Sequence, residues 1–168
     1  MSSVSPAFVL HISTPLGTMQ LTSSEENLFS ASFPENTPET DSPHPPACLR
    51  QAARQLEQYF AGQRTAFAVP LHPQGTAFQQ SVWQALRQIP AGRTDHYLGL
   101  AHRLGNPGAV RAVGAANGAN PFLVIIPCHR IIGAQGQLVG YAGGLWRKKW
   151  LLDHEAKLTG HYQPGLFD

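Results

Sequence analysis

The chain has 168 residues and a net charge of +2, with 13% of its residues charged. This length fits one domain or two small ones, and the composition is neither disordered nor fibrous. No apolar run is long enough to cross a membrane, and no basic segment followed by an apolar core marks a secretory signal. The two cysteines are far apart and form no disulfide framework, so we expect a cytoplasmic protein without a membrane partner.

The charge is unevenly distributed along the chain. Residues 1–75 contain three basic and six acidic side chains, whereas residues 76–168 contain nine basic and four acidic ones. A polyanion would therefore prefer the second part. An unevenly charged, solvated surface, which is common, would give the same counts.

The first part of the chain reads as a small sheet followed by a helix. Three short β-prone runs, separated by turn residues, predict an antiparallel meander over 8–12, 18–22 and 28–33. Five prolines predict an exposed loop over 34–46. Apolar residues at helical spacing then predict a helix over 47–60 that stops at Gly62. Residues 65–71 are either a strand or an extended linker.

The second part begins with a helix-turn-helix pattern. Thr76 and Gln79 form a predicted capping box for a helix that ends before Pro90. A shorter helix over 97–104 is closed by a glycine, and Asn106 is the predicted N-cap of a helix over 107–117. A strand over 122–126 and short segments around 137–140 would supply a wing.

The helix after the turn carries almost only small side chains. Arg111 is the one long basic residue between Gly108 and Gly118. A helix that reads the major groove needs several polar side chains, and this one lacks them. Small residues instead permit close approach to a narrow groove, where Arg111 would contact a phosphate or enter the base stack. A helix packed tightly against another element would show the same composition.

Cys128 and His129 form the candidate reactive pair. The β-branched run before them predicts a buried strand that Pro127 ends, so that Cys128 would be presented to a pocket. A thiolate is the nucleophile of cysteine chemistry, and a neighbouring imidazole can lower the thiol pKa. A buried, inert cysteine is the alternative that these two residues alone leave open.

Several longer motifs resemble the O6-alkylguanine-DNA alkyltransferase family. They are Ile126-Pro127-Cys128-His129-Arg130-Ile131-Ile132, the preceding Arg111-Ala112-Val113-Gly114-Ala115-Ala116-Asn117-Gly118-Ala119-Asn120-Pro121, Gly140-Tyr141-Ala142-Gly143-Gly144, and Lys149-Trp150-Leu151-Leu152-Asp153-His154-Glu155. The resemblance covers residues 76–157, whereas the N-terminal third matches only in outline. It is greatest to the bacterial constitutive type.

The resemblance implies an α+β fold in three parts. Residues 1–75 would form a ribonuclease H-like sheet with a helix, residues 76–160 a winged helix-turn-helix domain, and residues 161–168 a flexible tail. It also implies DNA repair by an irreversible transfer of the methyl group of O6-methylguanine, and of O4-methylthymine, to Cys128. The target base would be flipped from double-stranded DNA on the minor-groove side. No cofactor or metal is expected, and the protein would act as a monomer.

The resemblance also assigns roles to individual residues. Cys128 would accept the alkyl group, His129 would take the thiol proton through a water, and Glu155 would orient the imidazole. Tyr97 would crowd the target phosphate and protonate the leaving oxygen. The pocket and its hinge would comprise Asn120, Ile131, Tyr141, Ala142 and Gly143. The DNA-binding helix would use Arg111, Ala112, Gly114, Ala115 and Asn117.

Three features depart from the family or go beyond it. Ala142 stands where some members have a serine that contacts the base, and some members bind zinc in the N-terminal domain. Here His44 and Cys48, with His11 and His72 remote in sequence, are too few neighbouring ligands for a structural zinc site. The tail residues Gln163, Leu166 and Phe167 resemble the peptide by which bacterial repair proteins bind the sliding clamp; an ordinary frayed tail is the alternative.

Two other functions compete with alkyl transfer. A cysteine hydrolase would use Cys128, His129 and Glu155 over many turnovers, but it would leave the helix-turn-helix unexplained. A DNA-binding regulator with an inert cysteine would need base-reading side chains on the helix of Arg111. That helix lacks them, so we favour alkyl transfer.

Overall fold

The structure, a computed structural model, describes residues 5–36 and 39–167. Residues 1–4 of the predicted N-terminal domain, Thr37 and Pro38 of the predicted loop, and Asp168 of the predicted tail lie outside the described residues. The chain divides into two compact units between Gln74 and Gly75. Among the described residues, no helix is both long and apolar enough to cross a membrane.

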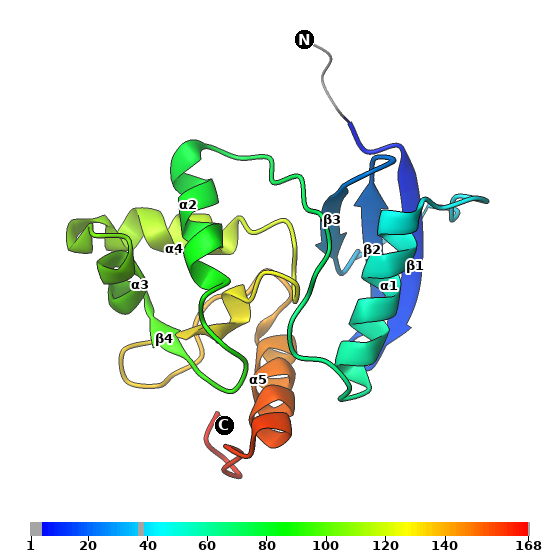
Figure 1. Cartoon of the computed structure of the whole chain (residues 1–168). Helices are drawn as coiled ribbons and strands as arrows, with labels where there is room; N and C mark the ends of the chain where they lie inside the picture. The colour runs from blue at the N-terminus through cyan, green and yellow to red at the C-terminus, as the bar shows by residue number, and fades with distance from the viewer. Residues whose placement is uncertain (1–4, 37–38, 168) are drawn as a thin grey trace. The chain divides into compact units, whose positions relative to one another are not determined.

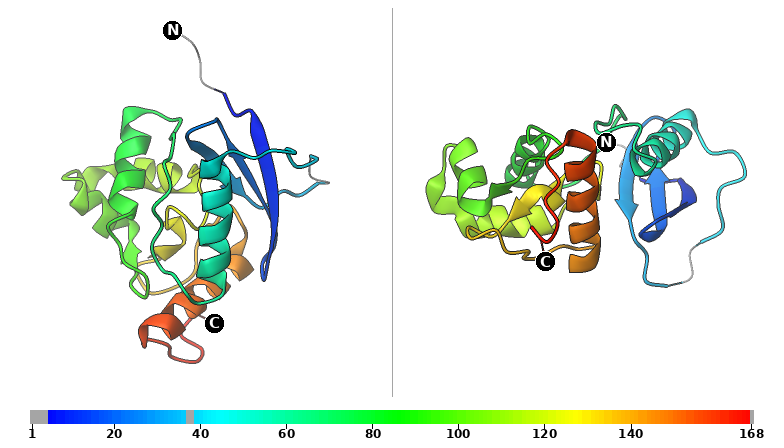
Figure 2. Two further views of the ribbon diagram at one scale, coloured as in Figure 1. Left: turned by 45° about the vertical axis from the view of Figure 1, so that its right-hand side comes forward. Right: turned by 90° about the horizontal axis from the view of Figure 1, so that it is seen from below.

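The first unit is a three-stranded sheet covered by one helix. Strands β1 (Phe8–Thr14), β2 (Gly17–Ser23) and β3 (Leu28–Ser32) pair antiparallel in that order, which confirms the predicted meander. Helix α1 (Ala47–Phe60), also as predicted, lies along one face of the sheet (Figures 1 and 2). Its apolar face is buried, so the helix and the sheet share one hydrophobic core.

The segment after α1 is an extended linker rather than a strand. Only Leu71 pairs with the sheet, through a single bridge to Leu28. The side chain of Gln55 holds this linker, because its Oε1 accepts from the Ala68 N–H at 2.9 Å and its Nε2 donates to the Ala68 carbonyl at 3.2 Å. Gln51 Nε2 also donates to the Ala68 carbonyl, at 2.9 Å, so two side-chain amides of α1 hold the linker in place.

The second unit is mainly helical and contains two very short strands. Its elements, in chain order, are α2 (Ala77–Leu86), β4 (Asp95–His96), α3 (Tyr97–Arg103), η1 (Pro107–Ala109), α4 (Val110–Gly118), η2 (Cys128–Arg130), β5 (Ile131–Ile132) and α5 (Leu145–Thr159). Strands β4 and β5 pair in parallel. Helices α2, α3 and α4 form the predicted helix-turn-helix group (Figure 1).

The start of this unit confirms the predicted capping box. Thr76 accepts from the Gln79 N–H, and the Gln79 side chain accepts from the Thr76 N–H. Trp83 on the buried side of α2 then donates from Nε1 to the Ala116 carbonyl at 2.8 Å. This bond fixes the end of α4 against α2.

Two local predictions need correction. Asn106 stands at the N-cap with Pro107 in the first turn, as predicted, but its side chain makes no cap and that turn is the 3-10 turn η1. The segment around 137–140 contains no strand, so the wing is a loop. That loop turns at Gly136, whose φ is +83°, and the Gly133 N–H donates to the Gln137 carbonyl at 2.8 Å.

The predicted strand over 122–126 is also wrong, since these residues form a buried turn. The Ile126 N–H donates to the Phe122 carbonyl at 2.9 Å, which closes the turn. Val124 has a φ of +73°, a conformation that β-branched residues rarely adopt. Such strain persists only where surrounding contacts impose it, and here the turn leads directly to Cys128.

Candidate functional site

Cys128 is presented by a turn that the side chain of Asn120 holds. The Asn120 Nδ2 donates to the carbonyls of Phe122 at 3.3 Å and Ile126 at 2.8 Å, and its Oδ1 accepts from the Phe122 N–H at 2.9 Å. The Cys128 N–H donates to the same Ile126 carbonyl at 2.8 Å. Asn120 therefore satisfies the backbone of a turn that has no ladder partner, and it fixes where η2 begins.

The Cys128 thiol is held in its neutral form. It is 3% exposed, and burial raises its pKa from 9.0 to about 11. The Asn120 side chain and the cation of Lys148 oppose this rise without cancelling it. At neutral pH the sulfur therefore keeps its proton, and ionisation needs a base at the moment of reaction.

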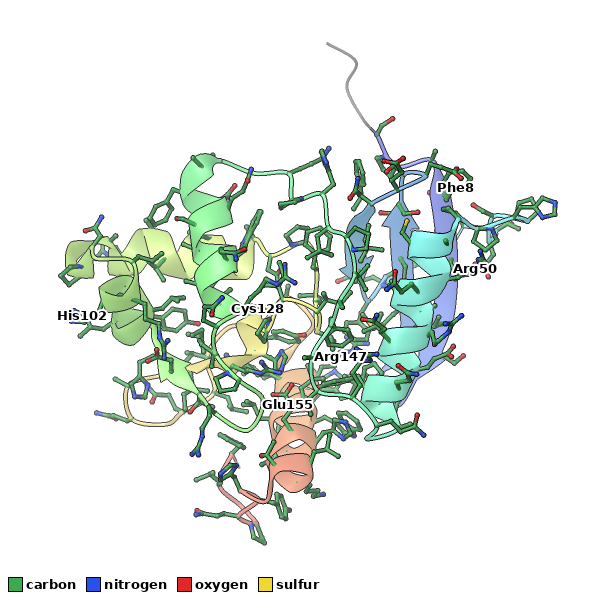
Figure 3. All side chains as sticks on the ribbon, viewed as in Figure 1. Phe8, Arg50, His102, Cys128, Arg147 and Glu155 are labelled. Atoms are coloured by element: carbon green, nitrogen blue, oxygen red, sulfur yellow. The ribbon has the colours of Figure 1, made fainter. Side chains whose placement is uncertain are left out.

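His129, Arg130 and Glu155 form a buried cluster beside Cys128. The Glu155 Oε2 lies 2.8 Å from His129 Nε2 and accepts from Arg130 Nη2 at 2.9 Å. Its Oε1 accepts from Arg130 Nε at 2.8 Å. Figure 3 shows Cys128 on η2 and Glu155 on α5, so the cluster joins two elements of the second unit.

The imidazole of His129 is neutral and has one unused nitrogen. Burial lowers its pKa below the ordinary 6.5, although the Glu155 carboxylate acts in the opposite direction. An ionised carboxylate can only accept, so the single proton of the neutral ring sits on Nε2. Nδ1 is then a bare acceptor, and it is buried without a hydrogen-bond partner among the described residues.

A cavity of about 110 Å³ opens over the sulfur. Its lining residues are Tyr97, Gly114, Asn117, Gly118, Cys128, Gly140, Tyr141 and Ala142. Two buried polar atoms, Asn117 Oδ1 and the Tyr141 hydroxyl, have no hydrogen-bond partner among the described residues. A cavity with unused polar groups beside a thiol is suited to a polar, planar guest.

Tyr97 is the first residue of α3 and is fixed at the cavity rim. Its hydroxyl donates to the Val139 carbonyl at 3.4 Å, and burial raises its pKa. Asp95 anchors this end of the helix, since it accepts from the His96 N–H at 2.8 Å and from Arg103 Nε at 2.7 Å. Because its pKa is raised, the Tyr97 hydroxyl keeps its proton at neutral pH.

Lys148 fixes the wall of the cavity at Val139 and Gly140. It is fully buried, and its Nζ donates to the carbonyls of Val139 at 2.7 Å and Gly140 at 3.1 Å. Burial lowers its pKa to about 8, while the charge on ionised Cys128 would raise it. Lys148 therefore ties the loop that carries Tyr141 and Ala142 to α5 and places a positive charge near the sulfur.

Helix α4 has two distinct faces. Arg111, Ala112 and Ala115 are exposed, whereas Asn117 is buried and, with Gly114, lines the cavity. Residues 111, 112 and 115 lie on one side of the helix, as their spacing requires. The exposed face is thus smooth apart from one arginine.

The remaining candidates are dispersed. Ile131 and Gly143 are buried but do not line the cavity. Ile131 pairs with Asp95 in the two-stranded ladder of β4 and β5. In the first unit, His44 is exposed and the Cys48 thiol contacts the Ser24 and Glu25 carbonyls. His11 contacts Asp41 and Gln20, and His72 stacks on Phe29. No group of three potential metal ligands occurs among residues 5–36 and 39–167.

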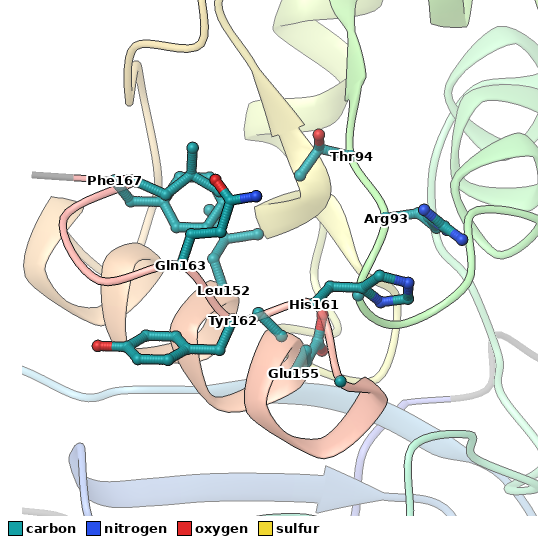
Figure 4. A pocket seen from close by; sticks show the side chains of 12 residues that line it. Arg93, Thr94, Leu152, Glu155, His161, Tyr162, Gln163 and Phe167 are labelled. Carbon is teal, nitrogen blue, oxygen red and sulfur yellow. The ribbon is translucent and has the colours of Figure 1, made fainter.

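The tail folds into a turn beside α5. The Leu166 N–H donates to the Gln163 carbonyl at 3.1 Å, and Leu166 is 51% exposed. Gln163, Leu166 and Phe167 line a second cavity, of about 390 Å³, together with Leu152 of α5 (Figure 4). The apolar pair of the tail is therefore only partly covered.

Two buried cations were not predicted as functional residues. Arg130 belongs to one of the family motifs, but no role was predicted for it from the sequence. A charged residue between the apolar residues Ile126 and Ile131 is rarely buried unless it is paired, and this indicated a buried ion pair. Lys148 falls on the same helical face as Leu151, Leu152 and Glu155. That spacing was the signal that Lys148 points inward.

Comparisons with known proteins agree with this geometry. Residues 77–157 match the DNA-binding domain of 6-O-methylguanine DNA methyltransferase, and residues 10–73 match its ribonuclease-like domain. A methylated-DNA–protein-cysteine methyltransferase of Methanosarcina acetivorans is 47% identical over 146 residues, which cover 84% of this chain and 94% of that protein. A protein of the same name from Mycobacterium bovis is 46% identical over 147 residues, which cover 86% of this chain and 89% of that protein.

Solved structures give the same result. The crystal structure of Mycobacterium tuberculosis O6-methylguanine methyltransferase is 45% identical, with a TM-score of 0.80 over 89% of this chain and 93% of that one. The OGT protein of that organism in complex with DNA also has a TM-score of 0.80 and is 45% identical, over 88% and 92% of the two chains. The chain therefore belongs to the 6-O-methylguanine DNA methyltransferase family, with its ribonuclease-like and DNA-binding domains in that order.

Proposed function

We propose that the chain repairs DNA by moving the methyl group of O6-methylguanine to Cys128, once per molecule. The observation that carries this proposal is a buried thiol that opens into a cavity beside a His129–Glu155 pair, next to a helix of small residues. The solved relative in complex with DNA supports DNA as the partner, and we infer that it is double-stranded. We also infer that the protein works in the cytoplasm, because Cys48 and Cys128 are free thiols.

The proton movements follow from the protonation states at the site. His129 Nδ1 takes the thiol proton through a water, and the Glu155 carboxylate orients the ring and stabilises the imidazolium that forms. The sulfur then attacks the methyl carbon, so that an S–C bond forms and the C–O bond breaks. Tyr97 holds its proton at neutral pH and donates it to the departing O6.

A base inside a duplex cannot reach the sulfur, so the target nucleotide must leave the stack. The exposed side of α4 suits the minor groove, and Arg111 would fill the gap that the flipped base leaves. Asn120, Ile131, Tyr141, Ala142 and Gly143 would shape the receiving pocket. Its volume of about 110 Å³ is below the roughly 300 Å³ of small ligand sites, so we expect the wall at Gly140–Ala142 to open. O4-methylthymine carries the same O-methyl group on a smaller ring and is a second expected substrate.

The deciding experiment is a titration with a duplex that contains one O6-methylguanine. We expect a single methyl group on Cys128, located by intact mass and peptide mapping, and repair that stops at one equivalent of DNA. The thioether has no ready leaving route, which is why the reaction ends there. Turnover beyond one equivalent would indicate a hydrolase. Tight binding with an unmodified Cys128 would indicate a DNA-binding protein without repair activity.

Arg111→Ala should slow repair of duplex DNA by about 10- to 100-fold and leave repair of a single-stranded oligonucleotide nearly unchanged. The reason is that a single strand leaves no gap to fill when its base turns out, so Arg111 matters only in a duplex. Single-turnover rates on both substrates measure this ratio. Arg54→Ala, an exposed arginine of α1, serves as the matched control. Equal slowing on both substrates would assign Arg111 to general phosphate binding.

The partly exposed tail supports a second contact, with the replicative sliding clamp, through Gln163, Leu166 and Phe167. Replacing Leu166 and Phe167 by alanine should abolish binding to immobilised clamp and leave methyl transfer unchanged. The two apolar side chains supply most of the contact area of so short a peptide. Leu158→Ala, an exposed leucine of α5, is the control. Absence of clamp binding by the unaltered protein would end this proposal.

A further inference from the structure

Arg130 is bound to Glu155 more extensively than His129 is. Its guanidinium donates to both carboxylate oxygens, from Nε at 2.8 Å and from Nη2 at 2.9 Å. Its Nη1 donates to the Ile89 carbonyl at 2.6 Å. Arg130 is 5% exposed, and Ile89 follows the end of α2. The carboxylate that faces His129 is therefore fixed in position by a planar fork, which is itself anchored to another element.

The charges around His129 make Arg130 the partner of the Glu155 anion. The charged groups that act on the imidazole are Arg130 of η2 and Lys148 and Glu155 of α5, and the Tyr141 ring stands edge-on to it with the two ring centroids 6.5 Å apart. At neutral pH the thiol, the tyrosine and the imidazole are uncharged. Lys148 is directed at the Val139 and Gly140 carbonyls, whereas Arg130 contacts both oxygens of the carboxylate directly as a permanent cation.

Resting on the proposed function, we propose that Arg130 is a positioning residue that keeps His129 in its reactive tautomer, with the proton on Nε2 and the lone pair on Nδ1. The fork holds Glu155 as an anion aimed at Nε2, and an anion can only accept. Because Nε2 must then carry the proton of a neutral ring, Nδ1 stays bare. The base that removes the Cys128 proton is thus set by a residue that touches neither the thiol nor the substrate.

Proton counting shows what the loss of Arg130 would do. Without the guanidinium, a buried carboxylate charge remains, and burial alone raises the pKa of Glu155. The cluster then takes up one proton from solvent. If the ring takes it, both nitrogens are protonated; if Glu155 takes it, the acid donates to Nε2 and the ring proton moves to Nδ1. Either way Nδ1 gains a proton and loses its function as a base.

The experiment measures the protonation state of His129 Nδ1 directly, by two-bond ¹⁵N–¹H correlation spectra of the intact protein at pH 7. We expect an unprotonated Nδ1 in the unaltered protein and in Arg130→Lys, which retains the charge, and a protonated Nδ1 in Arg130→Met. Single-turnover methyl transfer should fall by about 100-fold or more in Arg130→Met and recover most of that loss in Arg130→Lys. Arg50→Lys, at an exposed arginine of α1, controls for loss of a guanidinium.

Each result bears on the proposal separately from the proposed function. A folded Arg130→Met with a bare Nδ1 and an unchanged transfer rate would overturn it. If that variant does not fold, Arg130→Met combined with Glu155→Gln removes both buried charges, and a persistently bare Nδ1 there would equally overturn it. A tautomer that changes as expected, in a protein that methylates no Cys128, would instead reject the proposed function and retain the role of Arg130.

Discussion

Cys128→Ser should abolish methyl transfer, with no methylated protein detectable by intact mass, while binding to duplex DNA stays within about two-fold. The hydroxyl of serine ionises far less readily than a thiol, and its oxygen is a much weaker nucleophile toward an alkyl carbon. The exposed face of α4, which we expect to bind the DNA, lies outside η2 and is unaffected by the change. Fluorescence anisotropy with a labelled duplex measures the binding.

Cys48→Ser is the matched control for this prediction. Cys48 is the other free thiol; it is also buried, and it contacts the Ser24 and Glu25 carbonyls of the first unit. The control should accept one methyl group at the rate of the unaltered protein. Methylation of Cys128→Ser, or failure of Cys48→Ser, would place the acceptor elsewhere than Cys128.

Local sequence signals predicted most helices and strands correctly. The meander, α1 and the Thr76 cap depend on contacts between residues close in sequence, and propensity and capping describe such contacts well. The turn at Phe122–Ile126 was misread because its β-branched composition favours a strand. Asn120, which is close in sequence but lies outside that run, takes the backbone groups that a neighbouring strand would have used.

The candidate site was predictable as a set of residues, whereas its electrostatics were not. A motif can pair Cys128 with His129, but it cannot show that Lys148 and Arg130 are buried with them. Burial decides whether the thiol is ionised at rest, and it depends on packing across α5, η2 and the loop before α5. Burial raises the pKa of the Cys128 thiol, which supports the expectation that the thiol is deprotonated during the reaction and not before it.

Glu155→Gln should lower the free energy of unfolding by about 3 to 5 kcal/mol at pH 7, because it leaves the Arg130 guanidinium buried without its carboxylate. Methyl transfer should slow as well, since a glutamine does not fix the imidazole as an anion does. Urea unfolding measures the stability. Asp153→Asn breaks an ion pair with Lys149 on the same helix and should change the stability by less than about 1 kcal/mol.

The pH dependence gives the sharper form of this prediction. In the folded protein the His129 pKa lies below the ordinary 6.5, so the unfolded chain binds an extra proton and stability falls as the pH drops below about 6.5. The Glu155 pKa also lies below its ordinary 4.5, because the attraction of His129 and Arg130 outweighs the effect of burial. Below about pH 4.5, Glu155 therefore adds a second loss of folding stability, of up to about 1.4 kcal/mol per pH unit. Glu155→Gln should remove the second loss and retain the first. A variant that still steepens below pH 4.5 as the unaltered protein does would show that Glu155 is not the group that titrates there.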